Sequence, residues 1–276
     1  MKKDIKLIGL DLDGTVFNNN KIISTRTKKA IENAIQKGVV VLPSTGRPFS
    51  GVPHDFMNIN GVKYVLTSNG AVIRDLHSEE IIYQDLMDVD LSLRIVNAVS
   101  DYNSLLEVYI EGRGYSDNNA LKSAISYIKD DALADYIIKS RIGIDDLSDF
   151  VQSENKAIEK IHLLFSDLSE KERVMEVLMK FDDEIVITSA MPNNIEINKK
   201  TVNKGNGLLA LGKLLGIKRE QIMACGDGGN DIEMIKAVGF GVAMGNAIEE
   251  VKEVADYVTL TNEDDGVAYA IEQFVL

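Results

Sequence analysis

The chain has 276 residues, of which 45% are hydrophobic and 26% are charged, so it can form one large or two ordinary globular domains with a sizeable core. Its 43 acidic residues against 30 basic ones give a formal net charge of −13, which repels nucleic acids and anionic membrane surfaces. The single cysteine, Cys225, excludes an internal disulfide and fits a reducing compartment.

The N-terminal residues do not resemble a secretory signal. Charged residues such as Asp4, Lys6 and Asp11 interrupt the first apolar stretch, so it lacks the continuous apolar core of a signal peptide. No apolar run in the chain approaches the length of a membrane span. We therefore expect a cytoplasmic protein, a monomer or a small homo-oligomer, with neither nucleic acid nor membrane as a partner.

The N-terminal part of the chain alternates strands with an amphipathic helix. Residues 24–38 are expected to form the helix, with Ser24 as its N-cap and Gly38 at its C-terminus. Apolar residues recur between them at helical spacing. The expected strands are residues 6–10, 39–42 and 64–66. A polar loop follows each strand, DLDGT at residues 11–15, STGRP at 44–48 and TSNG at 67–70.

The C-terminal part of the chain repeats this alternation. Its expected helices are residues 205–215 and 247–255, and its expected strands are residues 221–225, 240–244 and 257–260. The loop GDGGND at residues 226–231 follows the first of these strands. Alternating strands and helices predict a parallel sheet with right-handed crossovers. Ligands bind such a sheet at the loops that follow the carboxyl ends of its strands.

The middle of the chain follows a different pattern. Its expected helices are residues 91–102, 120–129 and 169–181, and its expected strands are residues 105–110, 158–165 and 184–189. The predicted fold class is therefore α/β, with a Rossmann-like parallel sheet core that has helices on both faces. This core is formed by residues 1–84 and 191–276, and residues 85–190 are an inserted α+β domain.

Two acidic residues stand at the end of the first expected strand. Asp11 and Asp13 are two residues apart, so their side chains project to the same side of an extended chain. Close carboxylates do not both ionise easily, so one pKa should rise unless a cation intervenes. One ionised and one protonatable carboxylate suit nucleophilic attack combined with acid–base catalysis. The plain alternative is an ordinary strand-to-turn Asp-Gly sequence, which the match to the whole DLDGT pattern outweighs.

The loop at residues 226–231 is a second acidic segment. Oxygen-rich loops with few basic neighbours suit a hard cation, and Mg²⁺ typically takes one or two protein carboxylates together with substrate phosphate. The alternatives are a plain turn or a calcium loop, but the ligand spacing of an EF-hand is absent. A cation here would also allow a strongly acidic protein to bind an anionic substrate.

The loop at residues 44–47 combines hydroxyls, a flexible backbone and a cation. Ser44 or Thr45, the backbone N–H of Gly46 and the Arg47 guanidinium together are typical of a site that surrounds a phosphoryl group. The alternative is that a hydroxyl of this loop caps a helix.

A lysine at the start of a helix could complete such a site. Lys204 opens the expected helix at residues 205–215 and could neutralise a transferring phosphoryl group. Lys199 and Lys200 are close competitors for this role, and a surface position is the plain alternative for each of them.

Several common catalytic motifs are absent. The sequence has no GxxxxGK[ST] loop of a P-loop nucleotide hydrolase and no GxGxxG after a strand. It also lacks HExxH, and its histidines, His54, His77 and His162, are dispersed. No GxSxG nucleophile elbow is present.

Taken in order along the chain, the motifs resemble those of the haloacid dehalogenase superfamily of phosphatases. They are DLDGT at residues 11–15, STGR at 44–47, Lys204-Gly205 and GDGGND at 226–231. The position of the inserted domain resembles the Cof-type branch, whose large cap lies between the second and third motifs. The resemblance covers nearly the whole chain, including residues 67–71 and 241–247. It implies a Mg²⁺-dependent phosphatase that hydrolyses a small phosphorylated metabolite, a sugar phosphate or a cofactor phosphate, through an aspartyl-phosphate intermediate.

The resemblance also implies a role for each motif residue. Asp11 would be the nucleophile, and Asp13 would protonate the leaving oxygen and then deprotonate the attacking water. Thr45 would hydrogen-bond the phosphoryl group, and Lys204 would offset its charge. Mg²⁺ would be held by Asp11, the Asp13 main-chain carbonyl and Asp227, with support from Asp231 and Asn230. Substrate contacts would come from Gly46, Arg47, Asn69 and Asn230. Ser44 stands where the family often has alanine.

Two alternatives stay open. A phosphotransferase or sugar phosphomutase of the same superfamily would pass the phosphoryl group to a second hydroxyl instead of water, which depends on how well the cap excludes water. A non-catalytic phosphometabolite-binding protein would be expected to lack the two N-terminal aspartates. The cap is expected to set substrate specificity, and the candidate contacts flank its first turn, although a surface position is the alternative for each. They are Glu107, Tyr109, Arg113 and Tyr115.

Overall fold

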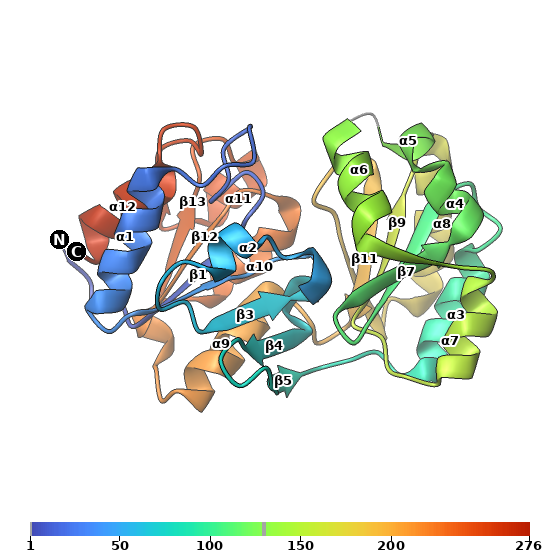
Figure 1. Cartoon of the computed structure of the whole chain (residues 1–276), viewed down its shortest axis with the longest axis horizontal. Coiled ribbons are helices and arrows are strands. Elements are labelled where there is room, and N and C mark those ends of the chain that lie inside the picture. Colours follow the sequence, from blue (N-terminus) through green and yellow to red (C-terminus); the bar gives the residue numbers. More distant parts are fainter. Residues whose placement is uncertain (1, 129–130) are drawn as a thin grey trace. The chain divides into compact units, whose positions relative to one another are not determined.

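The computed structural model describes residues 2–128 and 131–276 (Figure 1). The chain divides into two compact units. The first contains the chain up to Gly46, together with Val52–Gln84 and Asn203–Leu276. The second contains Arg47–Gly51 and Asp85–Val202. The insertion was expected at residues 85–190, whereas the second unit consists of Asp85–Val202 together with Arg47–Gly51.

A five-stranded parallel sheet forms the centre of the first unit. Its strand order is β14-β13-β12-β1-β2, and the residues of β1 and β12 are all buried. A strand buried on both faces must be apolar throughout, which explains the continuous hydrophobic runs. The strands are β1 (Leu7–Leu10), β2 (Val40–Pro43), β12 (Ile222–Gly226), β13 (Phe240–Ala243) and β14 (Tyr257–Val258).

Helices pack around this sheet, as the fold class requires. The helix predicted from Ser24 is confirmed: the Ser24 side chain accepts a hydrogen bond from Thr27 N at 3.0 Å, and Gly38 takes a φ of 82° after the last turn. Figure 1 shows this helix beside α12, with both chain ends nearby. The helices of the first unit are α1 (Thr25–Gln36), α2 (His54–Met57), α9 (Lys204–Leu214), α10 (Ile232–Ala237), α11 (Glu249–Val254) and α12 (Gly266–Phe274).

The third expected strand does not continue the parallel sheet. β3 (Tyr64–Thr67) instead begins a separate antiparallel sheet with β4 (Val72–Asp75) and β5 (Ile81–Gln84). One parallel bridge, between Ser44 and Leu66, connects this small sheet to the end of β2. The loop after β3 therefore still lies next to the loop after β2.

The second unit is built on a six-stranded sheet of order β10-β11-β9-β6-β7-β8. Neighbouring strands are antiparallel except for the parallel pair β7 and β8. One face carries the apolar side chains of the unit's larger core, including Val108, Ile161 and Ile197. The strands are β6 (Leu105–Ile110), β7 (Arg113–Asp117), β8 (Arg141–Ile144), β9 (Lys160–Leu164), β10 (Ile185–Thr188) and β11 (Asn194–Lys199).

Helices of the second unit contribute to two apolar clusters. Residues of α3, α7 and α8 belong to the larger one, and residues of α4, α5 and α6 pack with Leu105 and Leu164 in a smaller one. The helix expected at residues 120–129 is divided into α4 and α5, and its last residue lies outside the described residues. The helices are α3 (Val89–Val99), α4 (Asn118–Lys122), α5 (Ala124–Tyr127), α6 (Asp131–Ser140), α7 (Leu147–Glu154) and α8 (Leu168–Leu178).

The end of the second unit lies beyond residue 190 because of β11. This strand was not predicted, and it pairs with β9 on one side and β10 on the other. Its residues therefore belong to the antiparallel sheet of the second unit and not to the parallel sheet of the first. The remaining short segments are 3₁₀ turns, namely η1 (Phe49–Gly51), η2 (Ser68–Gly70), η3 (Met179–Phe181), η4 (Arg219–Gln221) and η5 (Gly229–Asp231).

Candidate active site

Three parallel strands of the first unit end at one edge of its sheet. Asp11 directly follows β1 and its N–H donates to Cys225 O at the end of β12, at 3.0 Å. Thr45 follows β2, and its N–H donates to Leu66 O at 2.9 Å. Asp227 directly follows β12. Because neighbouring parallel strands end at the same edge, these residues of distant motifs are brought together.

Lys204 connects two of the acidic side chains. Its ammonium donates to Asp11 Oδ1 and to Asp231 Oδ1, each at 2.7 Å, and its side chain is completely buried. Burial lowers the pKa of this ammonium, but the two carboxylates raise it above its ordinary value. Lys204 is the first residue of α9, whose N-cap side chain, Asn203, accepts from Asn206 N at 2.8 Å. The competitors Lys199 and Lys200 belong to the second unit.

The loop after β12 is held in a fixed shape by Asp231. The second oxygen of this carboxylate accepts the backbone N–H groups of Asp227 at 2.9 Å and Gly228 at 3.0 Å. The Thr15 hydroxyl donates to Asp227 Oδ1 at 2.7 Å. Gly14 lies so close that a Cβ on it would overlap with Asp227 Oδ2. The Asp227 carboxylate is therefore fixed by contacts from both acidic loops.

Three carboxylates of the site form a cluster that favours a cation. Asp11, Asp227 and Asp231 each place one oxygen within 4.8 Å of the others. Burial raises the pKa of Asp11 well above its ordinary value. Lys204 lowers this pKa, whereas the negative charges of Asp231 and Asp227 raise it. Burial and the charge of Asp231 raise the pKa of Asp227 to about 7. A clustered set of oxygen donors with disfavoured negative charge fits a hard divalent cation.

Asp13 lies outside this carboxylate cluster. Its Oδ1 is 2.9 Å from the ammonium of Lys21, and about two fifths of its side chain is exposed, at 39%. Lys21 was not predicted, because a lysine in a polar loop carries no signal that separates it from a surface residue. Thr15 was part of the DLDGT motif, but no role had been inferred for it.

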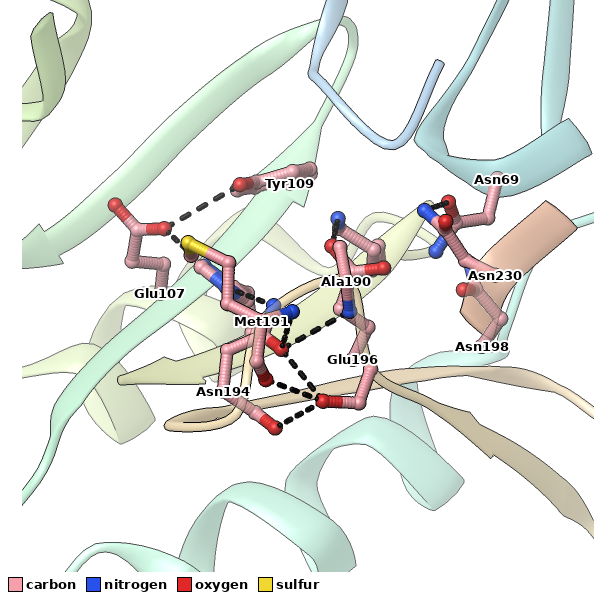
Figure 2. A network of polar contacts seen from close by, with 12 residues as sticks. Asn69, Glu107, Tyr109, Ala190, Met191, Asn194, Glu196, Asn198 and Asn230 are labelled. Carbon is pink, nitrogen blue, oxygen red and sulfur yellow. Dashed lines mark hydrogen bonds and ion pairs between the residues drawn. The ribbon is translucent and has the colours of Figure 1, made fainter. Parts of the chain in front are cut away.

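The segment after β3 reaches the same site from the small sheet. Asn69 N donates to Thr45 O at 3.1 Å, and Asn230 Nδ2 donates to Asn69 Oδ1 at 3.2 Å (Figure 2). Ser68 and Asn69 both have a left-handed backbone, with φ of 52° and 59°. Such a conformation is uncommon for residues other than glycine, so the surrounding structure must hold it in place. The predicted pair Asn69 and Asn230 is thus brought together beside Thr45.

Comparison with known proteins decides the family. The sequence profile described as haloacid dehalogenase-like hydrolase matches residues 8–271, almost the full chain.

The chain belongs to the haloacid dehalogenase-like hydrolases.

Similar members of this hydrolase family are phosphatases. The chain is 34% identical to a 5-amino-6-(5-phospho-D-ribitylamino)uracil phosphatase of Bacillus subtilis, over 99% of this chain and 97% of that protein. It is 30% identical to another B. subtilis phosphatase, over 98% of this chain and all of the relative. A haloacid dehalogenase-like hydrolase from B. subtilis has a similar structure, with a TM-score of 0.85, 27% identity, and coverage of 99% and 100%. The chain is therefore a phosphatase of this family.

One predicted substrate contact of this hydrolase, Arg47, has partners in the second unit. Arg47 and the residues up to Gly51 belong to the second unit, whereas Gly46 belongs to the first. The Arg47 guanidinium stacks over the Tyr136 ring at 4.4 Å and donates to Gly51 O at 3.2 Å. The sequence places Arg47 in one motif with Thr45, but in the structure Thr45 belongs to the first unit and Arg47 to the second.

The candidate specificity residues divide between the two faces of the second unit's sheet. Glu107 and Tyr109 are buried on the polar face, where Tyr109 OH donates to Glu107 Oε2 at 3.3 Å (Figure 2). Tyr115 points to the opposite, apolar face, with its ring 4.6 Å from that of Phe150. Arg113 is exposed at the start of β7. Arg113 pairs with Ile110 and stands two residues before Tyr115, so it projects to the apolar face. Only Glu107 and Tyr109 lie on the polar face.

The polar face of this sheet carries further buried charges that sequence reasoning missed. Arg141 Nε donates to Glu107 Oε1 at 2.7 Å, and His162 Nδ1 lies 2.7 Å from Glu107 Oε2. Burial raises the pKa of Glu107, but Arg141 and His162 together lower it to about 2. Beside them, Lys160 donates to Glu196 Oε1 at 2.6 Å. The acidic and basic groups of this face are thus paired with one another.

Among residues 2–128 and 131–276, no helix combines the length and the apolar character that crossing a bilayer requires.

Proposed function

We propose that the chain is a Mg²⁺-dependent phosphatase that works through a phosphorylated Asp11. The observation that carries this proposal is the buried Lys204, which contacts both Asp11 and Asp231 at 2.7 Å while Asp227 lies within the same carboxylate cluster. A lysine that holds one oxygen of Asp11 leaves the second oxygen available for attack on phosphorus. The same arrangement brings positive charge next to the position where a phosphoryl group would be bound.

In the first half of the proposed reaction, Asp11 takes the phosphoryl group from the substrate. A carboxylate oxygen of Asp11 forms a bond to phosphorus while the bond from phosphorus to the leaving oxygen breaks. Asp13 donates its proton to that leaving oxygen, so the alcohol product leaves neutral. The Thr45 hydroxyl donates a hydrogen bond to the phosphoryl group, and Lys204 offsets part of its negative charge.

In the second half, water removes the phosphoryl group from Asp11. Asp13, now ionised, takes a proton from the water as the water oxygen bonds to phosphorus, and the bond between phosphorus and Asp11 breaks. This step returns both aspartates to their starting states and releases inorganic phosphate. Asp11, Asp227 and the Asp13 carbonyl, supported by Asp231, are the residues that would hold Mg²⁺. When bound, the cation neutralises the carboxylates and the phosphoryl oxygens.

We further propose that the second unit sets substrate specificity through its polar sheet face. Burying paired charges is often no more stabilising than burying well-packed apolar side chains, so their retention favours a role other than stability. A face that carries both donors and acceptors suits a ligand with many hydroxyl groups, such as a sugar or a polyol. The ribityl chain in the substrate named for the 34% identical relative is of this kind. We therefore propose a sugar phosphate or a cofactor phosphate as the substrate.

Phosphate release with purified protein tests the reaction. We expect turnover with Mg²⁺, none in excess chelator, and none for Asp11→Asn, while Asp55→Asn on the exposed side of α2 behaves as wild type. Asp13→Asn should keep the nucleophile but lose the base, so acid-quenched protein should carry an added phosphoryl group on the peptide that contains Asp11. Full activity in chelator, or a phosphoryl group trapped on another residue, would contradict the proposal.

A substrate screen tests the role of the second unit. Glu196→Gln and Lys160→Met remove one partner each of a buried pair on the polar face. Both should change the ranking of sugar, nucleotide and cofactor phosphates while hydrolysis of p-nitrophenyl phosphate stays near the wild-type rate. An unchanged ranking in folded variants would show that specificity lies elsewhere.

We also propose a cytoplasmic location and a monomeric or small homo-oligomeric state. The location is supported by the buried free thiol of Cys225, which needs no oxidising compartment. Cell fractionation and gel filtration are the corresponding tests.

A further inference from the structure

A tight loop after the first acidic motif brings a lysine to the proton-transfer residue. The Lys21 ammonium lies 2.9 Å from Asp13 Oδ1. Lys21 reaches this position with a left-handed backbone, at a φ of 59°. For a residue with a Cβ this conformation is unfavourable, so the loop must be held in place by other contacts.

The contacts that hold this loop come from its own asparagine. Asn18 O accepts from Lys21 N at 2.9 Å, and Asn18 N donates to Ile22 O at 3.1 Å. The Asn18 side chain closes the loop further, since its Oδ1 accepts from Asn20 N at 3.1 Å and from Ile22 N at 3.0 Å. The backbone direction at Lys21 is therefore fixed locally.

The segment from Gly14 to Phe17, which leads into this loop, is also fixed by the C-terminal part of the first unit. Asn246 Nδ2 donates to Gly14 O at 2.8 Å, and Asn262 Nδ2 donates to Phe17 O at 3.0 Å. The two asparagines are themselves connected, because Asn262 N donates to Asn246 Oδ1 at 2.9 Å. The chain on both sides of Asn18 is thus held in place, and Lys21 lies next to Asp13 as a result.

Stability does not account for this arrangement. The side chains of Lys21 and Asp13 are 58% and 39% exposed, and exposed ion pairs of this kind contribute little to stability. The loop is held by its own hydrogen bonds, so the Lys21–Asp13 pair is not needed to fix its shape. A pair that adds little stability, next to a residue that must move protons, points to a functional role.

We propose that Lys21 is a positioning residue for Asp13. Its ammonium holds the Asp13 side chain in the orientation from which the carboxylic acid gives its proton to the leaving oxygen and the resulting carboxylate later takes a proton from water. This inference rests on the proposed function, in which Asp13 performs both proton transfers. Lys21 itself makes no bond to the substrate and transfers no proton in this scheme.

The first variant to test is Lys21→Asn. Asparagine tolerates a left-handed backbone, so the loop should keep its shape, and its side chain is too short to reach Asp13 as the lysine does. Lys29→Gln, on the exposed side of α1, is the matched control because it also removes one positive charge from the first unit. Lys21→Arg keeps a long cationic side chain and should recover most of the activity.

The decisive measurement compares a poor leaving group with a good one. General acid catalysis contributes about 10²–10⁴-fold when the leaving oxygen needs a proton. In Lys21→Asn, kcat/KM for an alkyl phosphate should fall by about tenfold or more, while kcat/KM for p-nitrophenyl phosphate changes by less than about threefold. Because the second half-reaction always needs the base, p-nitrophenol should be released in a burst followed by slow turnover.

The same substitution in the Asp13→Asn background separates positioning from a direct contact with the substrate. If Lys21 acts through Asp13, Lys21→Asn should cause no further loss of kcat/KM for p-nitrophenyl phosphate in that background. Equal losses for both leaving groups, a further loss in the Asp13→Asn background, or wild-type kinetics in Lys21→Asn would each overturn the inference. An inactive wild type would instead contradict the proposed function, so the two failures are distinguishable.

Discussion

Replacing Asp227 by Asn should stabilise the metal-free enzyme although it removes a proposed metal ligand. Burial and the charge of Asp231 raise the pKa of Asp227 to about 7, from an ordinary value of 3.8. Between these two pH values the native state keeps a proton that the unfolded chain has released. The native state therefore binds more protons in this window, and the free energy of unfolding falls as the pH rises through it. The contribution of Asp227 is most favourable at the acid end and is lost by about pH 7.

The size of this effect follows from the width of the window. Each pH unit in which only the native state holds the proton changes the free energy of unfolding by about 1.4 kcal/mol. Between about pH 5 and about pH 7 the wild type should thus lose about 3 kcal/mol relative to Asp227→Asn, whose amide does not titrate. Because Asp227 is not fully buried, solvent screening reduces this value to about 2 kcal/mol.

Urea denaturation in excess chelator measures this difference directly. Wild type, Asp227→Asn and the control Asp55→Asn should be compared across this pH range. The control should follow the wild type, whereas Asp227→Asn should lose less stability as the pH rises. Added Mg²⁺ should stabilise the wild type and not Asp227→Asn, because only a ligand that binds the native state shifts unfolding. Parallel stability curves for wild type and Asp227→Asn would refute the electrostatic reasoning.

Three further outcomes are expected. Lys204→Met leaves two buried carboxylates without their cation, so it should abolish turnover and lower the free energy of unfolding by about 3–5 kcal/mol in urea denaturation. Gly14→Ala and Gly38→Ala both place a Cβ at a φ of 82° and should each cost about 1–2 kcal/mol. Only Gly14→Ala should also lose phosphatase activity, because only its Cβ overlaps with Asp227, so equal activity in both variants would count against this contact. Burial and a nearby carboxylate raise the pKa of the Cys225 thiol to about 12, so a thiol reagent should label it only in urea, and rapid labelling of the native enzyme would contradict its burial.

The sequence was sufficient to predict which residues meet just after the ends of the parallel strands. Asp11, Thr45 and Asp227 each come after a continuous apolar run, and neighbouring parallel strands necessarily end at one edge of their sheet. Their assembly could therefore be predicted without knowing how the chain connects them. Their individual chemical roles are a further step, which remains part of the proposal.

The locations of other residues depend on contacts with residues distant in sequence, and a local sequence pattern does not indicate such contacts. Lys199 ends β11 and pairs with Asp85 in the second unit, while Lys204 is buried in the first, yet the two are only five positions apart in sequence. β11 was missed because its polar side chains are buried. In the sequence, polar residues such as Glu196 look like those of an exposed loop. Arg47 follows Thr45 closely, but its guanidinium packs on a ring that is distant in sequence.

The central position of β1 also constrains how the protein is made. β1 lies between β2 and β12, and the residues of the entire second unit are translated before those of β12. A nascent chain therefore has one edge of β1 without its partner strand until Ile222–Gly226 has left the ribosome. During that interval the second unit already has every strand of its own sheet and can fold first. The unpaired apolar edge of β1 is meanwhile a site for aggregation or chaperone binding, and a chain that stops before β12 keeps that edge permanently.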